Sequence, residues 1–278
     1  GVGGREIGYL YGQYKRLRQF DAGVLTGKPL GFGGSLIRPE ATGYGLVYFT
    51  DNMLAANGKS FKDQTVLISG SGNVAQYAVQ KATELGAKVI SVSDSNGYII
   101  DETGIDFDLL VDIKEKRRAR LTEYAAEKPT AKYFEGSVWN YDGKADIALP
   151  CATQNEINGE QAAALVKNGV YCVAEGANMP SDLDAIKVYK ENGVLYGLAK
   201  AANAGGVAVS ALEMSQNSLR LSWTREEVDG RLKDIMANIF NTAKETAEKY
   251  DLGKDYLAGA NIAAFEQIAD AMIAQGLV

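Results

Sequence analysis

Short apolar runs alternate with longer segments of helical periodicity along most of the chain. From residue 65 onward, the short runs are typical of buried strands, and the longer segments place apolar residues at i, i+3 and i+4. This alternation predicts a parallel sheet covered by helices on both faces. The predicted strands span residues 65–69, 88–93, 147–150, 169–174 and 194–197. The predicted helices between them span residues 74–85, 108–127, 159–167 and 181–191.

Helical spacing also extends on either side of this alternating region. Residues 6–20 repeat apolar side chains on one helical face, and a second helix is expected over residues 42–57. A glycine-rich stretch separates the two, so we expect a domain boundary near Gly31. The last quarter is predicted to be helical over residues 209–221, 225–250 and 260–275.

The first predicted strand leads into a glycine pattern that carries chemistry. Gly70, Gly72 and Ala75 form G-x-G-x-x-A between a strand and a helix. Gly70 permits the tight turn, Gly72 lets the backbone approach a pyrophosphate, and the helix N-terminus favours phosphate. Glycine turns alone recur for steric reasons, but Asp94 ends the next strand about 20 residues on, where an acidic residue meets a ribose. Together these features predict a Rossmann-type dinucleotide site.

The choice between NAD and NADP depends on charge near the adenosine 2′ position. Asp94 alone favours NAD, because a carboxylate accepts a 2′-hydroxyl and repels a 2′-phosphate. Ser93 and Ser95 instead offer hydroxyl donors, and residues 114–118 form a basic run. The alternative is that this run is only a solvated basic face. We favour NADP and keep NAD as the less favoured cofactor.

Composition narrows the class of protein. The 278 residues are 46% hydrophobic and 23% charged, which is typical of a soluble globular chain. A net charge of −6 gives no support to a nucleic-acid or anionic-membrane partner. No apolar run approaches the roughly 20 residues needed to span a bilayer.

The rare residue types narrow the chemistry. Histidine is absent, which removes Ser-His and Cys-His pairs and the commonest metal ligand, so no metal site is expected. Cys151 and Cys172 lie in apolar runs and are expected to be small core residues in a reducing cytoplasm. The start at Gly1 resembles neither a signal peptide nor an initiator, so we expect a fragment.

Long motifs resemble those of the hexameric glutamate dehydrogenases over essentially the whole chain. They lie at residues 33–45, 70–77, 149–155, 175–180 and 201–207. The phosphate turn Gly-Ser-Gly-Asn-Val-Ala-Gln-Tyr and the later Ser-Asp-Ser are most similar to the bacterial NADP-using members. The resemblance implies an α/β fold, with a Rossmann-type doubly wound parallel sheet and flanking helices from a truncated second domain. It also implies a homohexameric full-length enzyme.

The resemblance assigns roles position by position. Thr42 matches the threonine that meets the nicotinamide carboxamide, and Ser210 matches the serine at the distal carboxylate of glutamate. Asp94 with Lys114 and Arg117 would hold the adenosine end. The full expected cofactor set is Thr42, Gly70, Ser71, Gly72, Asn73, Val74, Ser93, Asp94, Ser95, Lys114, Arg117, Ala152, Thr153, Gln154, Gly176, Asn178 and Asn203. The expected substrate set is Arg38, Asn203, Val207 and Ser210.

Each assignment has a purely structural alternative. Thr42 would be a helix-entry residue and Ser210 the N-cap of the helix expected over residues 209–221. Asn178 and Asn203 would be turn residues.

The implied reaction is the reversible reductive amination of 2-oxoglutarate by ammonia with NADPH. In the family, the catalytic aspartate precedes a Gly-Val-Gly segment, and this chain begins at Gly-Val-Gly, so we name no catalytic residue. We expect residues 1–32 to be a remnant of the substrate domain, residues 33–252 the dinucleotide-binding domain, and residues 253–278 a helix returning toward the substrate domain. Such a chain would bind NADP(H) without turning over glutamate.

Two other functions remain open. One is a related dehydrogenase acting on leucine, phenylalanine or valine, and the other is a free-standing NAD(P)-binding module. Ser210 argues against the first, because an apolar substrate would leave its hydroxyl unpaired at a cost of about 1 to 3 kcal/mol.

Overall fold

A parallel sheet forms the centre of the computed structural model, which describes residues 2–19 and 21–276. Its five strands lie in the order β2-β1-β6-β7-β8, and every neighbouring pair is parallel. The strands are β1 (Thr65–Ile68), β2 (Lys88–Val89), β6 (Ile147–Leu149), β7 (Cys172–Ala174) and β8 (Leu195–Gly197). This arrangement confirms the predicted α/β, Rossmann-type class.

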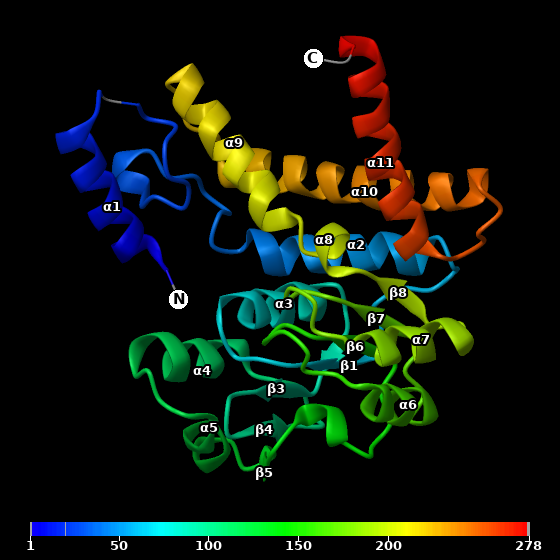
Figure 1. The fold of residues 1–278 in the computed structure, drawn as a ribbon. Helices are drawn as coiled ribbons and strands as arrows, with labels where there is room; N and C mark the ends of the chain where they lie inside the picture. The colour runs from blue at the N-terminus through cyan, green and yellow to red at the C-terminus, as the bar shows by residue number, and fades with distance from the viewer. Residues whose placement is uncertain (1, 20, 277–278) are drawn as a thin grey trace.

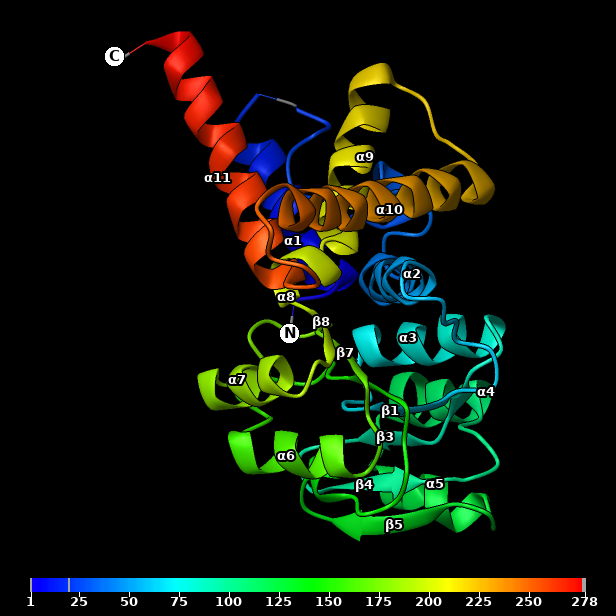
Figure 2. The same ribbon diagram turned by 90° about the vertical axis from the view of Figure 1, so that its right-hand side faces the viewer.

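Helices cover both faces of this sheet, as the apolar strands require. In Figures 1 and 2, α2 and α3 lie on one side of the sheet, and α6 and α7 lie on the other. These helices are α2 (Ala41–Ala55), α3 (Asn73–Glu84), α6 (Gly159–Lys167) and α7 (Leu183–Glu191). Leu46, Phe49 and Met53 of α2 have no exposed surface, because this helix is enclosed between the sheet layer and the C-terminal helices.

The C-terminal helices form a further layer over α2. They are α8 (Ala199–Ala202), α9 (Gly205–Leu219), α10 (Arg225–Lys249) and α11 (Tyr256–Gln275). In both views α11 projects from α10 away from the sheet (Figures 1 and 2). Both α9 and α11 begin earlier than predicted: α9 starts immediately after Ala204, and the Asp255 side chain caps α11 by accepting from the Ala258 N–H.

The predicted strand over residues 88–93 is wrong as a single element. After β2, the Ile90 N–H still donates to the Val66 carbonyl of β1, but the next residues turn into a separate antiparallel sheet. That sheet consists of β3 (Ser91–Ser93), β4 (Gly97–Ile100) and β5 (Lys132–Glu135). A turn closed by the Asp94 N–H and the Gly97 carbonyl, 2.8 Å apart, joins β3 to β4.

The predicted helix over residues 108–127 is also wrong, because the chain breaks it twice. It divides into α4 (Phe107–Val111), a π-helical turn over Asp112–Lys116, and α5 (Leu121–Glu127). Arg118 has a φ of 55°, which no α-helix accommodates. The Leu121 N–H donates to Asp94 Oδ2 at 3.2 Å, so a contact from another part of the chain fixes the start of α5.

The N-terminal segment begins with α1 (Gly4–Leu17), followed by a short helical turn at Leu30–Phe32. The predicted end of the first helix, residue 20, lies outside the described residues. So does residue 1, the first residue of the expected substrate-domain remnant. Tyr11 of α1 is buried and stacks on Phe32, with ring centroids 5.8 Å apart. Within the described part of the chain, no helix has the length and apolar character needed to cross a membrane.

Candidate functional site

The turn after β1 has the geometry of a phosphate-binding loop. Gly70 has a φ of +82°, and a Cβ there would lie 3.0 Å from the Cys151 carbonyl oxygen, so the turn requires glycine. A Cβ at Gly72 would instead meet nothing within 4 Å. Among the described residues, the N–H groups of Ser71 and Gly72 find no acceptor, and α3 begins at Asn73. The turn therefore offers free backbone donors at a helix N-terminus, which suits a phosphate.

Ser93 is hydrogen-bonded to this turn through both its side chain and its backbone. The Gly70 N–H donates to Ser93 Oγ at 2.7 Å, and the Ser93 N–H donates to the Gly70 carbonyl at 3.0 Å. Ser93 is only 7% exposed. The structure thus places its hydroxyl against the phosphate turn, with β3 locked to the end of β1.

Asp94 organises the loop beyond β3. Its carboxylate accepts from the N–H groups of Asn96 at 2.9 Å, Gly97 at 3.3 Å and Leu121 at 3.2 Å. Burial opposes the charged form, but these donors and then the Lys114 charge hold the pKa of Asp94 below its ordinary value. The carboxylate is therefore ionised at neutral pH and joins the β3–β4 turn to α5.

The predicted basic run splits into groups with different surroundings. Lys114 Nζ donates to the Ala119 carbonyl at 2.9 Å, and Arg117 pairs with Asp112 and Glu127. Arg120, which the sequence did not single out, donates from Nη1 to Ser95 Oγ at 2.7 Å. The break in the predicted helix is what brings this guanidinium to the β3–β4 turn. The roles of Lys114 and Arg117 at the adenosine end stay predictions.

A cleft of about 630 Å³ gathers most of the other predicted residues. It is lined by Arg38, Thr42, Val74, Cys151, Ala152, Thr153, Gln154, Gly176, Ala177, Asn178, Asn203, Gly206, Val207 and Ser210. Sequence reasoning missed Cys151, Ala177 and Gly206. A Cβ at Gly206 would lie 2.4 Å from Thr42 Oγ1, so the missing side chain makes room for the threonine hydroxyl. Only the Gly205-Gly206 pair in the motif signalled this contact.

Several of the structural alternatives can be checked directly. Ser210 as a helix N-cap is wrong, because α9 begins at Gly205 and Ser210 lies in its second turn. Thr42 lies inside the first turn of α2, whose N-cap position is Glu40. Asn178 and Asn203 meet each other, with Asn203 Nδ2 donating to Asn178 Oδ1 at 2.7 Å.

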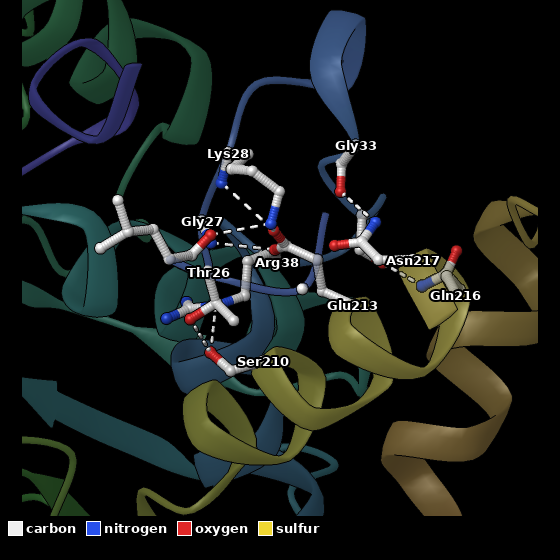
Figure 3. A network of polar contacts seen from close by, with 12 residues as sticks. Thr26, Gly27, Lys28, Gly33, Arg38, Ser210, Glu213, Gln216 and Asn217 are labelled. Atoms are coloured by element: carbon white, nitrogen blue, oxygen red, sulfur yellow. Dashed lines mark hydrogen bonds and ion pairs between the residues drawn. The ribbon is translucent and has the colours of Figure 1, made fainter. Parts of the chain in front are cut away.

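At the other end of the cleft, Ser210 is the centre of a polar cluster (Figure 3). Thr26 Oγ1 donates to Ser210 Oγ at 3.0 Å, and Arg38 Nε donates to the same oxygen at 2.9 Å. Because this oxygen accepts twice, its own proton is available to donate into the cleft. Thr26 was missed by sequence reasoning, since it lies 184 residues from Ser210 and outside every recognised motif.

A buried ion pair holds this region together one turn farther along α9 (Figure 3). Lys28 Nζ lies 2.7 Å from Glu213 Oε1, and neither side chain has any exposed surface. Glu213 also accepts from the Gly27 N–H at 2.9 Å, and Lys28 Nζ donates to the Leu25 carbonyl at 2.7 Å. We call residues 23–38 the strap, because this segment between α1 and α2 is held to α9 by these contacts and by the Asn217 side chain, which donates to the Gly33 carbonyl at 2.8 Å.

Comparisons with known proteins agree with this geometry. The family model described as glutamate/leucine/phenylalanine/valine dehydrogenase matches residues 33–276. The chain is 54% identical to the NADP-specific glutamate dehydrogenase of Giardia intestinalis and 55% identical to the NAD(P)-specific glutamate dehydrogenase of Xylanibacter ruminicola. All of the chain aligns with each of them but spans only 63% of their length.

A solved structure gives the same result in three dimensions. The chain is similar to the crystal structure of Plasmodium falciparum glutamate dehydrogenase, with a TM-score of 0.96 and 51% identity. The match covers 100% of this chain and 60% of that one. The chain therefore belongs to the glutamate/leucine/phenylalanine/valine dehydrogenase family.

Proposed function

We propose that the chain forms the NADP(H)-binding part of a glutamate dehydrogenase. Such an enzyme catalyses the reversible oxidative deamination of L-glutamate to 2-oxoglutarate and ammonia. The observation that carries the proposal is the combination of an open phosphate turn at Ser71 and Gly72 with a cleft that ends in the Ser210 cluster. The family match and the names of the relatives support the same reaction.

The proposed cofactor arrangement follows from the groups along the cleft. The pyrophosphate would lie against the Ser71 and Gly72 amides, and the adenosine would extend toward Asp94 and Ser95. The nicotinamide would point toward Thr42. Bound NADP(H) would supply the hydride that moves to or from the substrate α-carbon. The chain's own residues would bind and orient the cofactor and keep water from the cleft.

The polar cluster favours an acidic substrate over an apolar one. Ser210 would donate its proton to a distal carboxylate, and Arg38 would add a positive charge beside it. Leucine or valine in this position would leave the Ser210 proton without an acceptor, which costs about 1 to 3 kcal/mol. Val207 and Asn203 would complete the lining around the substrate.

The preference for NADP over NAD rests on the cations near the β3–β4 turn. The double variant Lys114→Ala with Arg117→Ala should weaken NADPH binding much more than NADH binding, because only NADPH carries a 2′-phosphate. Lys116→Ala is the matched control, since this exposed lysine pairs with Asp112, 3.2 Å away, and with no other acid among the described residues. Equal losses for both cofactors would contradict the assignment, and isothermal titration of the purified chain measures both.

The surroundings of the site are part of the proposal. Large apolar side chains on α1 and α11, including Tyr9 and Phe265, are mostly exposed. We infer that residues 1–32 and 253–278 belong with a second, substrate-binding domain, and residues 33–252 form the dinucleotide-binding domain. We also infer a homohexameric full-length enzyme and, from the two free cysteines, a location in the cytoplasm.

If the proton-transferring groups lie outside this chain, the chain should bind NADP(H) but not oxidise glutamate. The chain spans 63% of its curated relatives, and we infer that the groups that transfer protons lie in the remainder. A steady-state assay of this polypeptide with L-glutamate and NADP should therefore give no reduction of NADP. Robust glutamate oxidation by the polypeptide alone would contradict this inference.

A further inference from the structure

Two carboxylates next to the cleft-lining loops do not line the cleft themselves and have no part in the proposed reaction. Glu156 follows β6 and is half-buried, and Glu175 follows β7 and is 2% exposed. Burial raises the pKa of both groups, so ionising either one has a cost. A buried acid that the chemistry does not use requires a different explanation.

Glu156 holds the loop that follows β6. Its Oε1 accepts from the N–H groups of Ala152 at 3.1 Å and Thr153 at 3.2 Å. Its Oε2 accepts from Trp139 Nε1 at 2.9 Å, and Trp139 is itself buried. Ala152 and Thr153 both line the cleft. The carboxylate therefore ties two cleft-lining amides to a buried indole.

Glu175 does the same for the loop after β7. Its Oε1 accepts from the Ser181 N–H at 3.3 Å, and its Oε2 accepts from the Ala199 N–H at 2.9 Å. These contacts close the loop over residues 176–180 and fix the start of α8. Asn203, just beyond α8, then donates to the Gly176 carbonyl at 3.3 Å. One carboxylate thus sets the relative position of the two segments that carry Gly176 and Asn203.

The charge of these groups is unsuited to direct contact with the cofactor. A carboxylate would repel the phosphates of a dinucleotide, so it would weaken binding if it faced them. Both groups instead point their oxygens at backbone and indole donors. A glutamine at either position could accept hydrogen bonds only at its single side-chain oxygen. Its NH2 group would face the N–H donor that the second carboxylate oxygen now accepts.

We propose that Glu156 and Glu175 are positioning residues that hold the two cleft loops ready for the dinucleotide. The inference rests on the proposed NADP(H) binding and deepens it. The order of the strands puts β6 and β7 on the opposite side of β1 from β2. In the proposed arrangement, β2 leads to the adenosine end. Preformed loops there would act on the part of the cofactor beyond the adenosine.

The test uses two ligands of different length. NADPH spans the whole cleft, whereas adenosine 2′,5′-bisphosphate occupies only the adenosine end and the phosphate turn. Glu156→Gln and Glu175→Gln should each weaken NADPH binding by about fivefold or more, since hydrogen bonds of charged groups are lost. Neither should change the affinity for adenosine 2′,5′-bisphosphate by more than about twofold. Glu160→Gln, which alters an exposed carboxylate on α6, should change neither affinity.

The contrast between the two ligands separates positioning from general support of the fold. Equal losses for both ligands, or no loss for NADPH, would overturn the proposal. If Glu156→Gln does not fold, Trp139→Phe removes one donor to Glu156 and should weaken NADPH binding in the same selective way. An unselective effect there would count against the proposal equally. Failure of the unchanged chain to bind NADPH would instead contradict the proposed function itself.

Discussion

The phosphate turn offers backbone N–H groups to a ligand, whereas the Ser210 end of the cleft offers side chains that bind one another. Ser71 and Gly72 keep free donors among the described residues, in a turn fixed by local glycine geometry. Ser210, in contrast, takes its orientation from Thr26 and Arg38, which come from the strap. The phosphate turn is therefore built mainly by local sequence, and the Ser210 cluster by long-range contacts. The second should be the more sensitive to loss of a single partner.

The largest effect is expected from Lys28→Met, which leaves Glu213 buried without its cation. Breaking a buried pair in this way costs about 3 to 5 kcal/mol. Urea denaturation should show this loss in the free energy of unfolding. The double variant Lys28→Met with Glu213→Gln should recover most of it, because a neutral amide still accepts from the Gly27 N–H. A loss below about 1 kcal/mol, as for an exposed pair, would contradict the expectation that this end of the cleft is sensitive to loss of a single partner.

At the other end, Gly72→Val tests whether the turn is open for a ligand. The new side chain meets no protein atom within 4 Å of its Cβ, so the fold should tolerate it. The bulk would nevertheless occupy the path of the pyrophosphate, and NADPH affinity should fall by about tenfold or more, about 1.4 kcal/mol. Gly230→Ala on α10 is the control, since its Cβ also meets open space. Unchanged NADPH affinity for Gly72→Val would place the cofactor elsewhere.

Asp94→Asn should have an intermediate effect that depends on pH. The folded state holds the pKa of Asp94 below its ordinary value, so its charge stabilises the fold above that value. The substitution should cost about 1 kcal/mol near neutral pH. As pH falls below about 4, through the lowered pKa of the folded state, the difference from the unchanged chain should vanish. Urea denaturation at a series of pH values measures this, and a difference that grows toward acid would have the wrong sign.

The smallest effect is expected from Arg117→Gln, the exposed counterpart of Lys28→Met. Arg117 pairs with Asp112 and Glu127 at the surface, where solvent and ions screen the charges. The free energy of unfolding should change only slightly, and by less in high salt. A loss of stability as large as that expected for Lys28→Met would show that the exposed pairs of Arg117 and the buried pair of Lys28 do not differ in their contribution.

The same contrast explains which features the sequence predicted. The strand, the turn at Gly70 and Gly72, and the following helix follow from local geometry, and the structure has them where they were expected. The β3–β4 hairpin was missed, although Asn96-Gly97 is a hairpin turn signal. The sequence could not reveal Thr26, Lys28 or Glu213, because neither spacing nor residue type marks a contact across more than 180 residues.

The broken helix before α5 is a second feature that depends on a long-range contact and that the local sequence does not reveal. Apolar periodicity predicted one continuous helix, but the anchor of Leu121 on Asp94 overrides that preference. This tertiary contact moves Arg120, and not Arg117, to Ser95. Which cation reaches the β3–β4 turn therefore depends on a contact that the helical pattern does not contain.

The affinity of this chain for the two dinucleotides is the most direct test of the proposed cofactor site. Titration of the purified polypeptide with NADPH and with NADH, followed by nicotinamide fluorescence, measures both affinities in one experiment. We predict saturable binding at one site per chain, with NADPH bound more tightly than NADH. Absence of binding for both, or tighter binding of NADH, would contradict the proposal that this cleft is an NADP(H) site.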